Sequence, residues 1–319
     1  MKHIIRRCFL ILIIVFILAP LHSLYGQYRE YYFYGKVIDT QKVPLADVEI
    51  TLRDVETSRS YNVKTNKKGE FKLAGLPHGV YQVTFKKEGY APKEDEWRFT
   101  TPQDTMQKVE IPPVTLISEV KLQEAIKMQE MQGAVKEAFE KIRENDYDGA
   151  IAILKDVLAE EPEDPNALYL IGLSYSKKKM YREAVEILTR VVLLVPKFPP
   201  AEFELAVSYQ SLGEKDKALE HYRKTLDLDP DNPDAAYNAG LILFGENQVD
   251  EALAHFEKAL SLRPGDPAYL EMAGRCYVNK GDFSKAIEYL EQAKSELTNQ
   301  ERVEFLEGLI AKLKEQIKK

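Results

Sequence analysis

The chain of 319 residues is poor in the side chains that most often perform catalysis or bind metals, with two cysteines, five histidines and one tryptophan. It contains no His-Glu-x-x-His, no Gly-x-Ser-x-Gly and no glycine-rich phosphate-binding loop. Carboxylates are numerous, but their pattern is that of ordinary solvated helix faces. These absences predict a protein that is not an enzyme and that holds no metal and no cofactor.

The N-terminus has the layout of a secretory signal. Three basic residues precede twelve apolar residues, 8–19, and Pro20 with small or polar residues follows as far as Gly26. We predict that residues 1–26 are a signal peptide and that the protein is exported to the periplasm, the cell envelope or the extracellular space. The alternative is an uncleaved membrane anchor, although the apolar run is shorter than the ~20 residues that a span requires.

Removal of this segment leaves Cys276 as the one remaining cysteine, so the sequence excludes an internal disulfide in the processed chain. The whole chain has a net charge of −7. After residue 116 there are 27 basic and 38 acidic residues, which is a net charge of −11. Because an acidic region repels phosphate backbones, we expect no nucleic-acid partner.

Residues 30–116 show the alternation of apolar and polar side chains that is typical of β-strands. Seven segments carry it: Phe33–Val37, Val48–Leu52, Tyr61–Val63, Phe71–Leu73, Tyr81–Phe85, Trp97–Phe99 and Val109–Val114. Turn signals such as Asn66–Gly69 and Pro77–Gly79 lie between strands. About seven short strands in fewer than about ninety residues predict a two-sheet sandwich.

A series of short motifs runs through this segment: Gly35-Lys36-Val37, Pro44-Leu45, Gly69-Glu70-Phe71, Gly75-Leu76-Pro77 and Gly89-Tyr90. Their order is similar to that of the carboxypeptidase regulatory-like family. The resemblance implies a prealbumin-like sandwich and an extracytoplasmic setting, but it supplies no active-site residues. Such a domain is either a spacer that supports its neighbour or a binding surface in its own right.

From residue 131 onward the chain repeats with a period of 34 residues. Alanine recurs at this interval as Ala150, Ala184, Ala218, Ala252 and Ala286, and small residues recur as Ala138, Gly172, Ala206, Gly240 and Gly274. A fixed period of this length predicts a stack of similar small units, each of which buries its apolar face against the next.

We number the units from position 1 at Met131, Pro165, Pro199, Pro233 and Pro267. The small residues then fall at position 8 of a first helix, and the alanines at position 20 of a second helix. Small residues at the crossing allow two antiparallel helices to approach closely. Larger residues at position 24 are expected to fill the space around them: Leu154, Leu188, Tyr222, Phe256 and Leu290.

Three of the first helices have a capping residue before a proline at the first helical position, as Asp164-Pro165, Asn232-Pro233 and Asp266-Pro267. Phe198-Pro199 is the exception, and we expect the helix that follows it to be less well capped. Short polar segments between the two helices of a unit contain glycine, which suits a turn.

The spacings Gly172-Tyr175-Ala184-Pro196, Gly240-Ala252-Phe256-Ala259-Pro264 and Gly274-Tyr277-Ala286 resemble the tetratricopeptide repeat (TPR) family. The resemblance implies five units over residues 131–298. Residues 299–319 are expected to form a capping helix on the last unit, and residues 117–130 a helical linker. The predicted fold is therefore multidomain α and β: an N-terminal β-sandwich followed by an all-α TPR solenoid with a C-terminal capping helix.

Two histidines and one cysteine in the repeats could be reactive or metal-binding residues, or could serve only in packing. His221 and His255 share position 23 and would lie ~10 Å apart, whereas a shared metal requires both nitrogens within ~2.1 Å of one ion. We interpret them as one surface position that is repeated. Cys276 occupies the repeat position of Ser174 and Ser208, which predicts a small packed residue and not a reactive thiol.

In the family that the repeats resemble, positions 2, 5, 9 and 12 of the first helices line the concave surface. These positions are mainly apolar or aromatic here, and large apolar patches mark partner surfaces. The predicted partner-binding residues are Tyr169, Leu173, Phe203, Val207, Tyr237, Leu241 and Phe244. Such a surface suits a protein that offers an apolar or aromatic segment or an amphipathic helix. Alternatively, some of these side chains pack between neighbouring first helices, or against residues 117–130 folded back into the concave surface.

These observations support two hypotheses on function. The first is an exported, non-enzymatic scaffold or adaptor that binds another protein through the concave surface. The alternative is a cell-envelope accessory protein that binds glycan through the sandwich and an assembly or secretion machine through the repeats. Exposed aromatic side chains around Tyr90 and Trp97 would favour the alternative.

Overall fold

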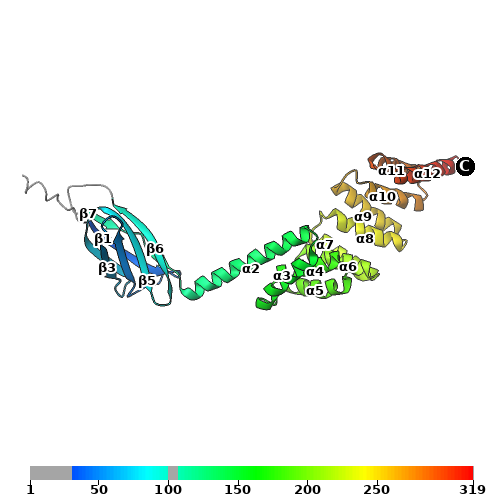
Figure 1. Ribbon diagram of the computed structural model, residues 1–319. Helices are drawn as coiled ribbons and strands as arrows, with labels where there is room; N and C mark the ends of the chain where they lie inside the picture. Colours follow the sequence, from blue (N-terminus) through cyan, green and yellow to red (C-terminus); the bar gives the residue numbers. More distant parts are fainter. Residues whose placement is uncertain (1–30, 100–106, 319) are drawn as a thin grey trace, which may run out of the picture. The chain divides into compact units, whose positions relative to one another are not determined.

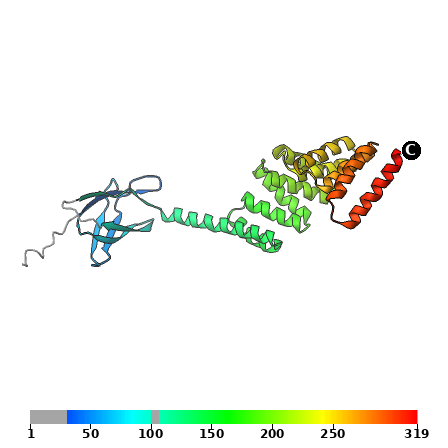
Figure 2. The same ribbon diagram turned by 90° about the horizontal axis from the view of Figure 1, so that it is seen from above.

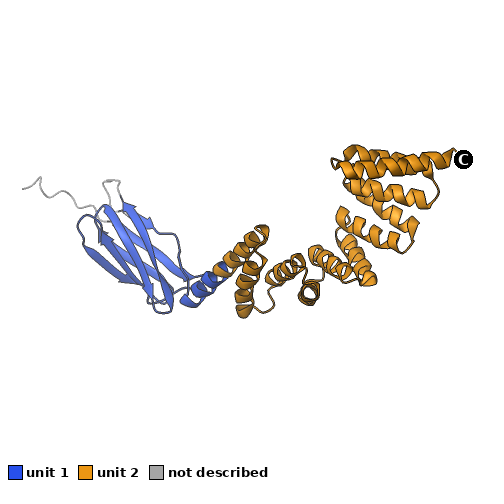
Figure 3. Cartoon of the chain, turned by 45° about the vertical axis from the view of Figure 1, so that its right-hand side comes forward, with its two compact units in different colours: residues 1–129 blue, residues 130–319 orange. Residues whose placement is uncertain are grey.

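The computed structural model describes residues 31–99 and 107–318, and the chain divides into two compact units, Met1–Gln129 and Glu130–Lys319 (Figure 3). The predicted signal peptide, residues 1–26, lies outside the described residues. Among the described helices, none combines the length and the apolar character needed to cross a membrane.

The first unit contains two β-sheets that pack as a sandwich (Figure 1). Its strands are β1 (Tyr31–Asp39), β2 (Glu49–Asp54), β3 (Ser60–Lys64), β4 (Glu70–Leu76), β5 (Gly79–Lys87), β6 (Tyr90–Phe99), β7 (Gln107–Glu110) and β8 (Val114–Leu116). One sheet has the order β4-β1-β7, with β8 also paired to β1, and the other has the order β3-β2-β5-β6. The sandwich architecture predicted from the sequence is confirmed.

The last predicted strand is an exception, because Val109–Val114 is two strands and not one. β7 ends at Glu110 and β8 begins at Val114, and both pair with β1 in parallel. Pro112 and Pro113 lie between them. Since proline has no backbone N–H to donate to a neighbouring strand, the pair interrupts the ladder.

The sandwich core is aromatic at its centre. Trp97 of β6 is only 8% exposed, and its ring centroid lies 6.3 Å from those of both Phe33 and Phe71. Tyr81 is fully buried, and its hydroxyl donates a 2.8 Å hydrogen bond to the carbonyl of Pro77. Large rings let a segment of this small size enclose a substantial apolar core.

The second unit is a stack of helical hairpins (Figure 2). The helices are α2 (Glu119–Arg143), α3 (Tyr147–Glu160), α4 (Pro165–Lys177), α5 (Tyr181–Leu194), α6 (Pro199–Ser211), α7 (Lys215–Leu228), α8 (Pro233–Gly245), α9 (Val249–Leu262), α10 (Pro267–Asn279), α11 (Phe283–Glu296) and α12 (Gln300–Ile317). The predicted linker and the first helix of unit one thus belong to a single continuous helix, α2, which begins at Glu119.

The packing inside each hairpin follows the predicted match of small and large residues. All five position-24 side chains and all five position-20 alanines are fully buried. A Cβ added to Gly240 would lie 2.7 Å from the ring of Phe256, and one added to Gly172 would lie 2.6 Å from Leu188. Such distances are shorter than real carbon–carbon contacts, so the glycines are required for the helices to approach this closely.

The helix starts also behave as predicted. The side chains of Asp164, Asn232 and Asp266 accept hydrogen bonds from backbone N–H groups in the first turns of α4, α8 and α10. Phe198, before α6, makes no such bond. The N-terminus of α6 therefore lacks the side-chain cap that the other three have.

The turn between the two helices of each unit uses one conformation throughout. Position 15 has a positive φ in every unit, at Asn145, Lys179, Gly213, Asn247 and Gly281. Glycine adopts this left-handed region without strain, and asparagine tolerates it better than other residues with a side chain. Lys179, with φ of 62°, is the residue least suited to this position.

The close approach at Gly240 predicts the effect of adding one methyl group. Gly240→Ala should lower the free energy of unfolding by about 1–3 kcal/mol, because the ring of Phe256 must move. The matched control is Gly308→Ala in α12, where a Cβ meets no atom within 4 Å. That change should stabilise by about 1 kcal/mol through helix propensity. Urea unfolding of both variants measures the difference, and equal effects would contradict this account of the hairpin.

The turn at Lys179 predicts a stabilising substitution. Lys179→Gly should raise the free energy of unfolding by about 0.5–1 kcal/mol, since it removes left-handed strain that exceeds the entropic cost of glycine. Gly213→Lys, at the equivalent turn, should have the opposite sign. Thermal melting of the two variants tests the pair, and the account is wrong if both move the melting temperature in the same direction.

Candidate functional site

The first helices of the units form the inner side of the stack. Contacts between neighbouring first helices occur between α4 and α6 and between α8 and α10. The helices on the more crowded side of a curved stack are those that line its inner surface. The C-terminal part of α2, which is the first helix of unit one, and α4, α6, α8, α10 and α12 therefore present the candidate binding face, which we call the inner face.

The predicted partner-binding residues lie on three of these helices: Tyr169 and Leu173 on α4, Phe203 and Val207 on α6, and Tyr237, Leu241 and Phe244 on α8. All seven are half-buried and pack against the hydrophobic core. They form a strip along the inner face, with part of each side chain in contact with the protein itself. The packing role considered from the sequence thus applies to all seven, and their role in binding a partner stays a prediction.

The position-5 rings show what this internal contact is. The centroid of Phe203 lies 5.8 Å from that of Tyr222, and that of Tyr237 lies 5.8 Å from that of Phe256. In both cases the partner is the position-24 ring of the same unit. Tyr169 instead packs edge-on against Phe198, at 5.0 Å. These rings support the hairpins that carry them.

Burial changes the pKa of two tyrosines in the strip, Tyr169 and Tyr237. Burial, with a smaller contribution from Glu204, raises the pKa of Tyr169 to about 12. The pKa of Tyr237 is raised mainly by burial and secondly by the charge of Glu271. Both hydroxyls stay protonated across the physiological range, so the strip carries no tyrosinate charge.

Two aromatic residues on the inner side are much more exposed than the seven predicted ones. Phe139 of α2 is 47% exposed, and Phe305 of α12 is 49% exposed. Phe139 lies at position 9, but Phe305 falls beyond the five predicted units. One further step of 34 residues from Glu271 reaches Phe305, and the same step from Gly274 reaches Gly308. Extending the period would have identified α12 as the first helix of a sixth unit.

Three carboxylates on first helices are almost fully buried, which the sequence pattern did not reveal. Glu204 of α6 accepts a 2.9 Å hydrogen bond from the Ser176 hydroxyl. Glu271 of α10 is held by arginines. Glu202 of α6 lies 2.6 Å from Nδ1 of His221. Their partners are distant in sequence, so only the fold brings them together.

The two histidines share a repeat position and are both partly exposed, but their environments differ. The side chain of His221 is 15% exposed, between the carboxylate of Glu202 and the ring of Tyr209 at 5.3 Å. The next unit has Ala236 and Leu243 at the equivalent positions, so His255 has a different environment. Within the described residues, no group of three or more His, Cys, Asp or Glu side chains is arranged to hold a metal ion.

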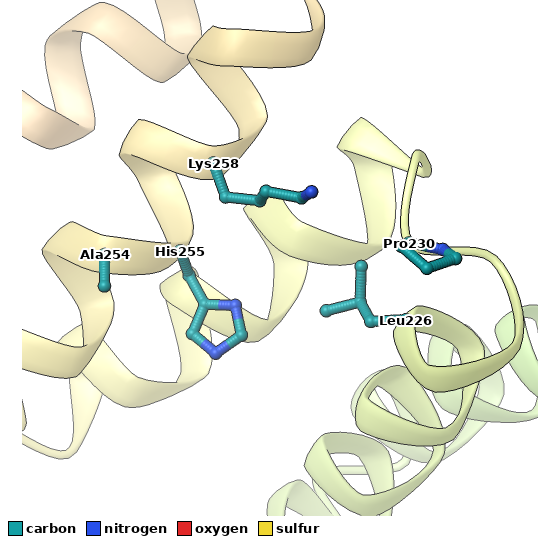
Figure 4. A pocket seen from close by; sticks show the side chains of 5 residues that line it. All are labelled: Leu226, Pro230, Ala254, His255 and Lys258. Atoms are coloured by element: carbon teal, nitrogen blue, oxygen red, sulfur yellow. The ribbon is translucent and has the colours of Figure 1, made fainter.

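His255 lines a shallow apolar pocket of about 230 Å³ between α7 and α9 (Figure 4). Leu226, Pro230, Ala254 and Lys258 complete its wall. Burial, followed by the charge of Arg223, lowers the pKa of His255 below its usual value. The imidazole is therefore neutral at pH 7. The pocket belongs to the second helices and is separate from the inner face.

Cys276 is a packed core residue, as predicted. It is fully buried, as are Ser174 and Ser208 at the same repeat position. Burial raises the pKa of its thiol to about 12. Because the thiolate is the reactive form, this cysteine is unreactive near neutral pH.

Tyr90 and Trp97 do not form the exposed aromatic surface that would favour glycan binding. Trp97 is part of the core, and Tyr90 is half-buried against the same core. The glycan alternative depended on exposed aromatic side chains around Tyr90 and Trp97, and these two side chains are not exposed.

Comparison with known families assigns both units. A model of the carboxypeptidase regulatory-like domain matches residues 33–112. Two models of the tetratricopeptide repeat match residues 203–267 and residues 141–202 and 243–313. The chain is thus a tetratricopeptide repeat protein that carries an N-terminal carboxypeptidase regulatory-like domain. A comparison with curated proteins gave no match.

Solved structures share the repeat fold over about half of the chain. YrrB, described as a TPR protein with an unusual peptide-binding site, is 22% identical with a TM-score of 0.50, and the match covers 58% of this chain and 97% of YrrB. A crystal structure of MamA is 27% identical with a TM-score of 0.47, covering 50% and 93%. MamA from Desulfovibrio magneticus RS-1 is 22% identical with a TM-score of 0.49, covering 52% and 94%.

The two kinds of aromatic residue on the inner side should respond differently to truncation. Tyr237→Ser should cost about 2–4 kcal/mol of stability, because its ring packs on Phe256 and on Tyr269 at 4.8 Å. Phe139→Ser should cost less than about 1 kcal/mol, since that ring is half exposed. Chemical unfolding followed by circular dichroism compares them. Equal losses would show that Phe139 is as deeply involved in packing as Tyr237.

Proposed function

We propose that this protein is an exported, non-enzymatic scaffold that binds another protein through the inner face of its repeat array. The repeats provide binding surface and, in the described residues, no metal-holding cluster. The sandwich serves as a spacer or a second contact. Export rests on the layout of residues 1–26, and a cleaved signal would place the chain in the periplasm or elsewhere in the cell envelope.

The observation that carries the proposal is the strip of seven half-buried apolar side chains on α4, α6 and α8. Single apolar residues are common on protein surfaces, but several partly exposed apolar residues on neighbouring helices form a patch of the kind that marks partner binding. The exposed Phe139 extends it at the N-terminal end. A partner segment that is apolar or aromatic, or an amphipathic helix, would complete the burial.

The charge of the repeat region and the comparison with YrrB both bear on the class of ligand. The region after residue 116 has a net charge of −11, which opposes binding to nucleic acid. YrrB, which shares the fold, is described as having a peptide-binding site. This description supports peptides as the first ligands to test on the present chain.

A double variant tests the inner face without collapsing the hairpins. Phe139→Ser with Val207→Thr removes apolar contact area and leaves the packed rings Phe203 and Tyr237 unchanged. We expect capture of the partner by crosslinking in the native cell to fall at least about five-fold, because apolar anchors dominate binding energy. Quantitative mass spectrometry of the captured proteins gives the measurement.

The control for this test is Leu193→Ser on the second helix α5. Leu193 is 75% exposed, so the change removes an exposed apolar side chain from outside the inner face. Its capture profile should equal that of the unchanged protein. If the double variant also captures the same proteins in the same amounts, with the same melting temperature, the inner face is not the binding surface.

A further inference from the structure

At the C-terminal end of the inner face, two arginines hold one buried carboxylate. Glu271 of α10 is 4% exposed. Arg302 of α12 donates to it from Nε at 3.0 Å and from Nη2 at 2.5 Å. Nη2 of Arg275 in α10 forms an ion pair with the same carboxylate at 2.9 Å. Two positive charges thus meet one negative charge, and the cluster retains one excess positive charge.

The same two guanidinium groups lie over a single exposed ring. The Arg302 guanidinium is 5.1 Å from the centroid of Phe305, and that of Arg275 is 5.9 Å from it. The side chains of Arg275 and Arg302 are 36% and 46% exposed, and Phe305 is 49% exposed. Stacking on the ring orients the planar groups while leaving their outer edges in solvent.

Glu271 does not use all the donors of the two arginines. It accepts hydrogen bonds from Nε and Nη2 of Arg302, and its ion pair with Arg275 is made through Nη2. Among the described residues, no acceptor is bonded to Nη1 of either arginine. Each guanidinium therefore has N–H groups available for a further acceptor, in a geometry already set by a buried anion and an aromatic ring.

The cluster is continuous with the apolar strip. Burial is the main cause that raises the pKa of Tyr237, and the charges of Glu271, Arg275 and Arg302 act on the same hydroxyl. Arg275 and Phe305 also occupy positions 9 and 5 of their units, the same positions as Leu241 and Tyr237. A segment bound along the strip would reach the arginines at its end.

We propose that Arg275, Arg302 and Phe305 form an acceptor for an acidic side chain of the bound partner segment. The carboxylate would receive hydrogen bonds from the free guanidinium edges, and an apolar neighbour in the segment would cover Phe305. The region after residue 116 is acidic overall, whereas this cluster is positive. An acidic side chain of the partner would therefore be attracted to the cluster and not to the rest of the region. The inference rests on the proposed function and adds the chemistry of one end of the ligand.

A displayed library of random twelve-residue peptides provides the probe. The C-terminus of each peptide is joined to the display coat protein, so a terminal carboxylate cannot substitute for an acidic side chain. Selection on the chain without residues 1–26 should enrich Asp or Glu next to an apolar residue at least about three-fold over the starting library. Selection in 0.5 M salt should reduce this enrichment, because half-exposed charges are screened.

Two variants with opposite expected effects on peptide affinity separate a role in binding from a role in stability. Arg275→Gln should abolish the acidic preference and weaken a selected acidic peptide about ten-fold in fluorescence anisotropy, since one charge-assisted contact is lost. Glu271→Gln should bind that peptide at least as tightly, because it removes the competing carboxylate. Arg182→Gln, at an exposed position of α5, is the matched control and should change nothing.

The outcomes discriminate between the two proposals. Selected peptides without an acidic preference, or with one that persists in Arg275→Gln, overturn the acceptor. If such peptides still lose binding in the Phe139→Ser and Val207→Thr variant, the inner face remains the binding surface. If Arg275→Gln and Glu271→Gln weaken binding equally, the cluster only anchors α12 and the acceptor is also overturned. A chain that retains no peptides contradicts both proposals.

Discussion

The second unit depends on one contact, the insertion of a large position-24 side chain against a small position-8 residue. Gly240 with Phe256 and Gly172 with Leu188 show how close this contact is, since neither glycine has room for a methyl group. The contact sets the distance between the two helices of a hairpin. It also decides the inner face, because a large ring at position 24 offers its edge to the position-5 side chain. Phe203 packs on Tyr222 in this way, and Tyr237 packs on Phe256 and also on Tyr269 of the next unit.

The inner face therefore has two kinds of surface. Its centre is an apolar strip whose rings also stabilise their own hairpins, so that under the proposed function partner contact and stability would be coupled there. Its ends differ in chemistry: Phe139 is an exposed ring, whereas Phe305 lies beneath two arginines that share Glu271. A surface that is apolar along its length and positive at one end favours a ligand of defined direction, because only one orientation places an acidic group beside the arginines.

The sandwich and the repeats differ in how much their sequences revealed. Alternation located six strands of the sandwich, but Pro112 and Pro113 divided the seventh predicted strand into β7 and β8. Alternation did not decide whether Trp97 faces solvent or the core, and it packs between the sheets because neighbouring rings enclose it. In the repeats, the period located caps, turns and core residues. It missed Phe305 because the count stopped at five units, although residues 302–309 continue the pattern.

The sequence alone determined the hairpin architecture. The contacting helix residues of a repeat are separated by a fixed number of residues, so the small residues at positions 8 and 20 and the large residue at position 24 can be recognised from the sequence. It determined the sandwich class for the same reason, through alternation. Only the tertiary structure decided which apolar residues are covered and which charges meet. His221 with Glu202, and Glu271 with Arg302, are pairs from different helices. Burial and charge pairing depend on distances across helices, and no spacing along the chain encodes them.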